Sequence, residues 1–311
     1  MTIQQDAGIT LIDAHHHLWD LGHLHYPWLT HWDPHTFMGD YRPIMRNYLP
    51  EDYRRDSHGH RVLATVHCEA DQDVNNEVAE TRWLHEVARH HAMPDAVIAH
   101  VFFHHPRCAE ILAEHCTYPM MRGIRCKPVT ARCADERHSV RGVPGSMQDP
   151  HWLAGYALLG NYQLSWDLRV PCWHLADAAE VARAFPDTPV VLNHLGFPWD
   201  RSPQGMAMWR DGMHALASCP NVSVKVSELG GPGLAWTPDN HRDVILETIA
   251  MFGIERCMFA SNFPVAGLQI SYHQLVLNMA EILADFSPPA REAFFWRNAR
   301  RVYRIPMAEP E

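Results

Sequence analysis

The chain has 311 residues, of which 47% are hydrophobic and 20% are charged, and its formal net charge is −10 at pH 7. This composition is that of a globular protein with a sizeable core, and the length fits one or two domains. The negative charge argues against a surface for nucleic acid or anionic membranes, and no apolar run approaches the ~18 residues of a membrane-spanning helix.

The N-terminus and the cysteines favour a cytoplasmic protein. The opening MTIQQDAG lacks a basic region followed by an apolar core, so we expect no signal peptide. The eight cysteines form no CxxC pair, and a chain of this length does not need disulfides for stability. We therefore expect free thiols in a reducing compartment.

Eight short apolar segments, rich in β-branched residues, recur along the chain. Each is nearly continuously apolar, as expected of strands buried on both faces of a parallel sheet. Turn signals or helical patterns lie between most of them. The segments span residues 8–15, 61–70, 95–103, 121–126, 162–168, 188–194, 221–227 and 256–261.

The clearest helical patterns span residues 74–91, 174–185, 204–218 and 238–253. In the last of them, Asp239 or Asn240 is the N-cap candidate and Gly253 marks the end. Eight strands that alternate with helices predict an α/β fold, a single-domain (β/α)8 TIM barrel over residues 1–311. A doubly wound open sheet is the alternative, but the even spacing of the later strands and the absence of a Gly-rich phosphate loop disfavour it.

Two long segments interrupt the alternation. Residues 19–60 are rich in Pro, Trp, Tyr and His, and residues 127–150 form a second irregular stretch. Long loops in a compact domain are usually functional or disordered, so we interpret both as covering loops at the barrel mouth. Residues 287–305 predict a terminal helical segment packed on the barrel.

Histidines stand where the predicted strands end, which in a barrel of this kind is the side of the active site. The first strand ends in His15, His16 and His17. Alternation along a strand puts His15 and His17 on one side and His16 on the other. The sixth strand ends in His194. We therefore expect His15, His17 and His194 to converge at the barrel mouth.

The other strand ends supply further polar candidates. An arginine there could hold a carboxylate at two points, and the tryptophans could line a ring-binding pocket. Arg122 and Arg125 lie on opposite sides of their strand by alternation, so at most one faces the centre. The candidates are Glu69, Arg122, Arg125, Trp166, Arg169, Glu228, Asn262 and, after the first strand, Trp19.

Lys225 lies within the seventh apolar segment. Two roles are open, a buried charge with a carboxylate partner or a lysine that bridges two metal ions. The incomplete set of acids disfavours the second role.

The motifs LIDAHHHLWD (11–20), LNHLGFP (192–198) and CMFASNFPV (257–265) resemble the opening, middle and closing motifs of the amidohydrolase superfamily. Their branch is the amidohydrolase-2 group, which includes sugar-lactone lactonases and 2-pyrone-4,6-dicarboxylate lactonase. The resemblance covers essentially the whole chain, since ETRWL, RGIR and PNVSVKVS follow in the family's order. It implies a TIM barrel with hydrolytic or decarboxylative chemistry at its mouth.

The resemblance also implies roles for the histidines. At the positions of His15, His17 and His194, relatives hold a divalent ion such as Zn²⁺ or Mn²⁺, or polarise the substrate carbonyl without metal. The family's strand-eight Asp, a metal ligand or general base, is Asn262 here. Asn cannot take a proton from water and is a weak, neutral ligand. A metal-free site is therefore an open alternative, and Glu228 or Glu69 is the candidate base, with Glu228 favoured.

We predict a hydrolase that opens a small lactone, carboxylated or sugar-derived, whose carbonyl is polarised by the histidine cluster. Two alternatives stay open: non-oxidative decarboxylation of an aromatic acid on the same fold, and a barrel that has lost catalysis and binds a ligand. The expected partner is a small-molecule substrate, and a homo-oligomer is compatible with the sequence.

Overall fold

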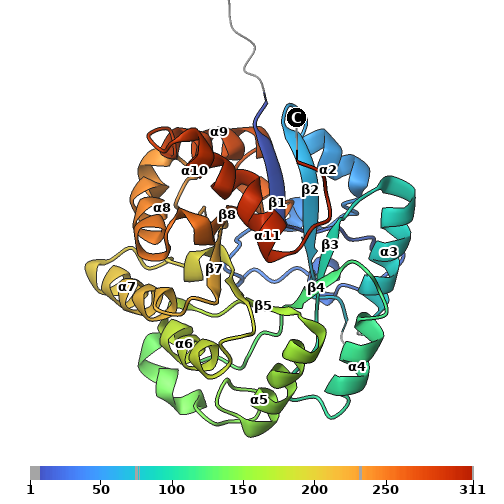
Figure 1. Ribbon diagram of the computed structural model, residues 1–311, viewed down its shortest axis with the longest axis vertical. Helices are drawn as coiled ribbons and strands as arrows, with labels where there is room; N and C mark the ends of the chain where they lie inside the picture. Colours follow the sequence, from blue (N-terminus) through green and yellow to red (C-terminus); the bar gives the residue numbers. More distant parts are fainter. Residues whose placement is uncertain (1–7, 74–75, 77, 231–232, 310–311) are drawn as a thin grey trace, which may run out of the picture.

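The computed structural model describes residues 8–73, 76, 78–230 and 233–309. Eight parallel strands form a nearly closed barrel, each paired with the next in chain order, and helices surround it (Figure 1). This arrangement confirms the predicted (β/α)8 barrel. The strands are β1 Thr10–His16, β2 Arg61–Cys68, β3 Ala96–Ala99, β4 Met121–Ile124, β5 Ser165–Leu168, β6 Val190–Leu192, β7 Val222–Val226 and β8 Cys257–Phe259.

Most strands are shorter than the apolar segments that predict them. The difference lies mainly at their C-terminal ends, as in β3, which stops at Ala99 although the apolar segment runs to residue 103. Beyond the last paired residues the chain leaves the sheet and enters the loops at the barrel mouth. Apolar character continues there because residues such as Val101 and Phe103 are still buried.

The helices cover the outside of the barrel, and the four helical patterns are found close to their expected places. They are α1 Pro27–Thr30, α2 Pro50–Asp56, α3 Ala79–His91, α4 Cys108–His115, α5 Pro150–Ala157, α6 Leu175–Ala184, α7 Pro203–Ala217, α8 Pro238–Phe252, α9 Tyr272–Ile282, α10 Pro288–Glu292 and α11 Asn298–Val302. Across the described ranges, every helix is too short or too polar to cross a membrane.

Two helix starts differ from the prediction. The cap of α8 is Thr237, whose Oγ1 accepts from the backbone N–H of Asn240 at 3.3 Å, so neither Asp239 nor Asn240 is the cap. Pro238 explains the difference, because it is favoured at the first helical position and so places the cap one residue earlier. Helix α3 begins at Ala79, and residues 74, 75 and 77 of that prediction lie outside the described residues.

Barrel closure brings the end of β8 beside the end of β1. The backbone N–H of Asn262 donates to His15 O at 2.7 Å, and that of His17 donates to Phe263 O at 2.8 Å. The Asp13 carboxylate reinforces the seam, since it accepts from the Ser261 N–H at 2.9 Å and the Ser261 hydroxyl at 2.6 Å. The histidines of the first strand therefore lie next to Asn262.

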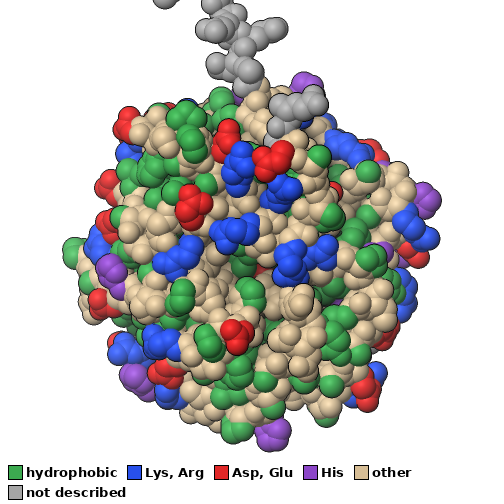
Figure 2. Space-filling view, in the orientation of Figure 1, with side chains coloured by type: hydrophobic (Ala, Val, Ile, Leu, Met, Phe, Trp, Pro, Cys, Tyr) green, Lys and Arg blue, Asp and Glu red, His purple; other side chains and the backbone are tan. Residues whose placement is uncertain are grey.

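The C-terminal segment closes the opposite end of the barrel. Trp296, Ala299 and Tyr303 pack against interior residues of the strands. Figure 2 shows the face that carries α11, where Lys and Arg side chains gather. Arg297 and Arg300 there are paired with Glu309, so this surface is an ion-pair network at the end of the barrel remote from the strand ends.

Candidate active site

A pocket lies at the C-terminal ends of the strands and under residues of the β1–β2 loop. Its polar lining is His17, Asp71, Arg125, Lys127, Arg169, His194, Glu228 and Asn262. Its apolar lining is Trp28, Phe37, Met38, Ala70, Phe197 and Val265. A pocket at this end of a TIM barrel that combines apolar walls with convergent polar groups is the expected form of an active site.

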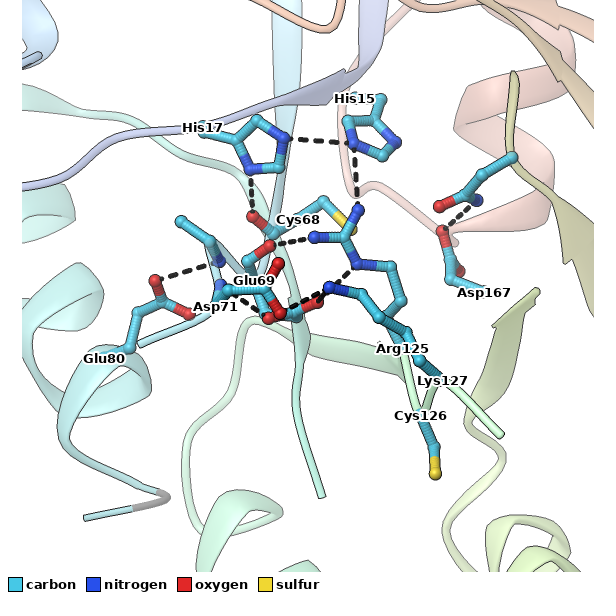
Figure 3. Close-up of polar contacts among 12 residues, drawn as sticks. His15, His17, Cys68, Glu69, Asp71, Glu80, Arg125, Cys126, Lys127 and Asp167 are labelled. Atoms are coloured by element: carbon cyan, nitrogen blue, oxygen red, sulfur yellow. Dashed lines mark hydrogen bonds and ion pairs between the residues drawn. The ribbon is translucent and has the colours of Figure 1, made fainter. Parts of the chain in front are cut away.

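The three predicted histidines meet at the floor of this pocket. His17 Nδ1 lies 2.7 Å from Cys68 O, so it donates its N–H there and Nε2 carries the lone pair. His15 Nε2 lies 3.3 Å from that Nε2, as Figure 3 shows. The His194 ring centroid is 4.8 Å from that of His15, and its Nδ1 is bonded to Ser227 Oγ at 2.8 Å. His17 and His194 line the cavity, whereas His15 is fully buried behind them.

All three histidines are neutral at neutral pH. Burial is the largest cause and lowers the pKa of each ring well below its usual value. Nearby cations lower these pKa values further: Lys225 acts on His15, Arg125 on His17 and Arg169 on His194. Neutral imidazoles can donate or accept hydrogen bonds, so their tautomers decide what they do.

His16 points away from the cluster, as alternation predicts. Its ring packs 4.7 Å from that of Tyr53, and neither ring nitrogen has a hydrogen-bond partner among the described residues. The HHH run is therefore a pair of site residues separated by a core residue.

Glu228 and Asn262 form the side of the pocket next to the histidines. The Asn262 amide Nδ2 donates to the Glu228 carboxylate, which leaves its Oδ1 3.2 Å from His17 Nε2. Burial raises the pKa of Glu228 to about 7, although the Asn262 hydrogen bond and the charge of Arg169 lower it in part. A carboxyl with such a pKa exchanges its proton at neutral pH, as a general base must.

Five residues that line the pocket have a left-handed backbone: the predicted site residues His194, Glu228 and Asn262, and also Asp71 and Phe197. His194, Glu228 and Asn262 have φ values of +57°, +51° and +56°, the left-handed region that side chains other than Gly rarely adopt. Strained residues cluster at functional sites, where the surrounding fold maintains them. The strain at these three residues therefore lies in the loops that follow β6, β7 and β8 at the pocket.

Glu69, the other candidate base, is held in ion pairs. Arg125 Nε lies 2.5 Å and Lys127 Nζ 3.5 Å from Glu69 Oε1, as Figure 3 shows. Burial would raise the pKa of Glu69, but the charges of Arg125 and Lys127 hold it well below its usual range. Glu69 is thus a fixed counter-ion, and we infer that it is not the base.

Arg169 differs from the other pocket cations. Its guanidinium lies over the rings of Phe197 and Phe37, 5.1 and 5.7 Å from their centroids. No carboxylate among the described residues lies within ion-pair distance of it. Arg169 is therefore the pocket cation that has its charge free for a ligand.

Three predicted substrate-binding residues lie elsewhere. The Arg122 Nη1 donates to Pro119 O at 2.8 Å, because Arg122 is the second residue of β4 and alternates to the side opposite Arg125. Trp166 alternates with the inward-facing Asp167 and so faces outward, where its Nε1 donates to Cys126 O at 3.1 Å. Trp19 is fully buried behind His17, and its ring stacks 6.2 Å from that imidazole. None of these three side chains is among the residues that line the pocket.

Sequence reasoning missed several lining residues. Lys127 and Asp71 follow Arg125 and Glu69 by two positions, and this spacing could have indicated that they share a side. Phe37 and Met38 come from the long β1–β2 loop, whose path has no sequence signal. They nevertheless support the interpretation of that loop as a cover.

The donor set does not fit a divalent metal ion. His17 Nε2 lies 3.3 Å from His15 Nε2 and 3.2 Å from Asn262 Oδ1, and these distances are compatible with ligands of one small ion. A metal-bound histidine, however, donates its other N–H to an acceptor. His15 Nδ1 instead faces the ammonium of Lys225 at 3.5 Å, and Arg125 Nη1 lies 3.5 Å from His15 Nε2. No group of three His, Cys, Asp or Glu side chains in the described ranges is arranged to hold an ion.

The amidohydrolase family profile matches residues 12–305, almost the whole barrel. The chain belongs to the amidohydrolase family. This match confirms the resemblance seen in the three motifs, and the protein is thus an enzyme of a hydrolase family. The match begins at Ile12, just before the histidine run, and ends at Ile305 in the terminal segment.

Relatives of this amidohydrolase include proteins with assigned reactions. It is 37% identical to protein y4mH of Sinorhizobium fredii, over 96% of this chain and all of that protein. It is 28% identical to L-fucono-1,5-lactonase of Burkholderia multivorans, over 96% of this chain and 97% of that enzyme. A crystal structure of a Burkholderia multivorans amidohydrolase with bound Zn superposes with a TM-score of 0.78 at 24% identity, covering 96% of this chain and 100% of that one. That likeness shows the shared fold.

Proposed function

We propose that this amidohydrolase is a lactonase, which opens a small carboxylated or sugar-derived cyclic ester with water. The observation that carries the proposal is Glu228, a carboxyl with a pKa of about 7 that lines the pocket beside the neutral histidines. The reaction named for the Burkholderia multivorans relative supports it.

The proposed reaction needs a base, a polarised carbonyl and an anchor for the substrate. Glu228 takes a proton from water as its oxygen attacks the carbonyl carbon, and negative charge then develops on the carbonyl oxygen. The ring C–O bond breaks, and the proton passes to the departing oxygen to give a hydroxy acid. Within the histidine cluster of His15, His17 and His194, we assign polarisation of the carbonyl to His194, whose Nε2–H is available when its Nδ1 accepts from the Ser227 hydroxyl, together with the fixed charge of Arg125; His15 and His17 hold the floor in place.

Arg169 is the proposed anchor for a substrate carboxylate. We expect Arg169→Met to raise KM for a carboxylated lactone by about 10- to 100-fold, because a charge-assisted hydrogen bond contributes roughly 1.5–3 kcal/mol. The effect on kcat should be small, since the anchor is remote from the reacting bond. Steady-state kinetics on the acid and on its methyl ester measure this difference.

The ester is the internal control, since its KM should not change in the variant. Arg242→Met, which removes a surface arginine paired with Glu281, is the matched control for loss of charge. Equal loss of activity on acid and ester would contradict the assignment of Arg169.

Asn262 is proposed to orient Glu228. Glu228 is then the only acid at the ends of β7 and β8 among the residues that the structure describes. We expect Asn262→Asp to move the acidic limb of the kcat/KM profile upward by about one pH unit or more, because a second carboxylate raises the pKa of Glu228. Activity at pH 7 should fall. A pH profile combined with elemental analysis checks this, and a variant that gains both a stoichiometric metal and activity at pH 7 would overturn the proposed role.

A further inference from the structure

A buried ion pair lies directly beneath the histidine cluster, inside the barrel. Lys225 Nζ on β7 is 2.5 Å from Asp167 Oδ2 on β5, and both side chains are fully buried. Asp167 also accepts from the Tyr303 hydroxyl at 2.9 Å and from Asn193 Nδ2 at 3.3 Å. The Asp167 carboxylate thus has three hydrogen-bond donors around it and holds Lys225 in place. Lys225 is therefore a buried charge with a carboxylate partner, the first of its two predicted roles.

The lysine presents a donor to His15. Its Nζ lies 3.5 Å from His15 Nδ1 and 5.0 Å from the centroid of the Tyr303 ring. An ammonium group has only donors, so it interacts favourably with Nδ1 only when that nitrogen carries the lone pair. Burying a charged pair is costly and adds little stability compared with apolar residues, so the position of the lysine calls for a reason other than stability.

The other ring nitrogen of His15, Nε2, must instead carry the hydrogen. It faces His17 Nε2 at 3.3 Å, and that nitrogen carries a lone pair because His17 Nδ1 donates to Cys68 O at 2.7 Å, a shorter contact than the 3.2 Å to Asn262 Oδ1 that favours a hydrogen on Nε2. A hydrogen on His15 Nε2 satisfies this contact, whereas a lone pair there would oppose another lone pair. Arg125 Nη1, 3.5 Å from Nε2, favours the other tautomer and is as distant as Lys225 Nζ is from Nδ1, so the closer contact with His17 Nε2 decides between the two tautomers.

We propose that Lys225, held by Asp167, is a positioning residue that fixes His15 as the Nε2–H tautomer. The hydrogen bonds then run in one direction, from Lys225 to His15, from His15 to His17 and from His17 to Cys68 O. Fixing the tautomer fixes the orientation of His17, which lines the pocket. The catalytic part of this inference rests on the proposed function, whereas the tautomer itself does not.

The tautomer can be observed without any activity assay. Long-range ¹H–¹⁵N correlation spectra of histidine-labelled protein distinguish the two neutral tautomers, and loss of signals in His15→Gln identifies the His15 resonances. We expect the wild-type spectrum to show Nε2–H at His15 and Nδ1–H at His17. Nδ1–H at His15 would overturn the proposal, and this result needs no variant of the ion pair.

The paired variant Asp167→Asn, Lys225→Met removes both charges together, so no buried charge is left without a partner. We expect His15 to lose its Nε2–H preference and kcat to fall by about 10- to 100-fold or more with KM nearly unchanged, as when a residue that orients a catalytic histidine is removed. Arg210→Met, Glu247→Gln, which removes a half-exposed pair, is the matched control and should change neither.

The outcomes separate the two proposals. If the wild type opens no lactone but His15 shows Nε2–H that depends on Lys225, the proposed function fails and the positioning role stands. If the paired variant keeps the Nε2–H tautomer, or loses kcat without any change at His15, the positioning role fails. A variant that does not fold leaves the wild-type spectrum as the deciding measurement.

Discussion

Replacing Glu228 with Gln lowers kcat/KM by about 1,000-fold in our account, within the range expected for loss of a general base. Gln keeps the size of the side chain and a hydrogen-bonding oxygen for Asn262, but it cannot accept a proton from water. In the wild type, the base must be ionised, so activity should rise as the pH increases through about 7, the pKa of Glu228. The acidic limb of the profile should vanish in the variant.

Glu80→Gln is a suitable control, because Glu80 is also a buried carboxyl and burial raises its pKa to about 8. It does not line the pocket and accepts hydrogen bonds from Ala70 N and the Tyr26 hydroxyl. Its substitution should leave the pH profile unchanged. Full activity of Glu228→Gln, or an unchanged acidic limb, would show that another group activates the water.

The largest effect on stability is expected from Arg125. Arg125→Met leaves the Glu69 carboxylate, only 1% exposed, without its main partner at the pocket floor. Removing one member of a buried ion pair costs about 3–5 kcal/mol in the free energy of unfolding. Because the folded-state pKa of Glu69 is lowered, the pair stabilises the protein above the unfolded pKa of Glu, and this stabilisation is lost as the pH falls through the folded pKa.

Denaturant unfolding at pH 7 measures this cost. Arg210→Met removes a pair with Glu247 whose N–O distance is 2.7 Å, but its side chains are 42% and 33% exposed, so it should cost no more than about 1 kcal/mol. Adding Glu69→Gln to Arg125→Met should recover much of the loss, because it removes the unpaired charge. If Arg125→Met costs no more than the surface variant, Lys127 alone suffices to hold Glu69.

Local periodicity predicted the elements of the site that lie on strands. Alternation placed His15 and His17 together and His16 apart, and the order of the strands placed Glu228 beside Asn262. The same rule applied to β5 indicates that Trp166 faces outward, since Asp167 faces inward. Position at the strand end, without alternation, is what groups Trp166 with the candidate site residues.

Other features depend on contacts between distant segments, which a single sequence does not specify. Phe37 reaches the pocket through the path of a long loop, and Arg169 is a free cation only because neighbouring acids pair with other residues. Glu69 and Glu228 look equivalent in the sequence. Their pKa values move in opposite directions because Arg125 and Lys127 surround one, while burial dominates the other.

The most direct test of the account is turnover of a panel of carboxylated and sugar-derived lactones by metal-stripped protein, followed as acid release and ring opening, with Glu228→Gln in parallel. We predict one equivalent of acid for each ring opened by the wild type, and loss of turnover in the variant. Carbon dioxide released from an aromatic acid without ring opening, no turnover of any lactone, or turnover that appears only after metal is restored would contradict it.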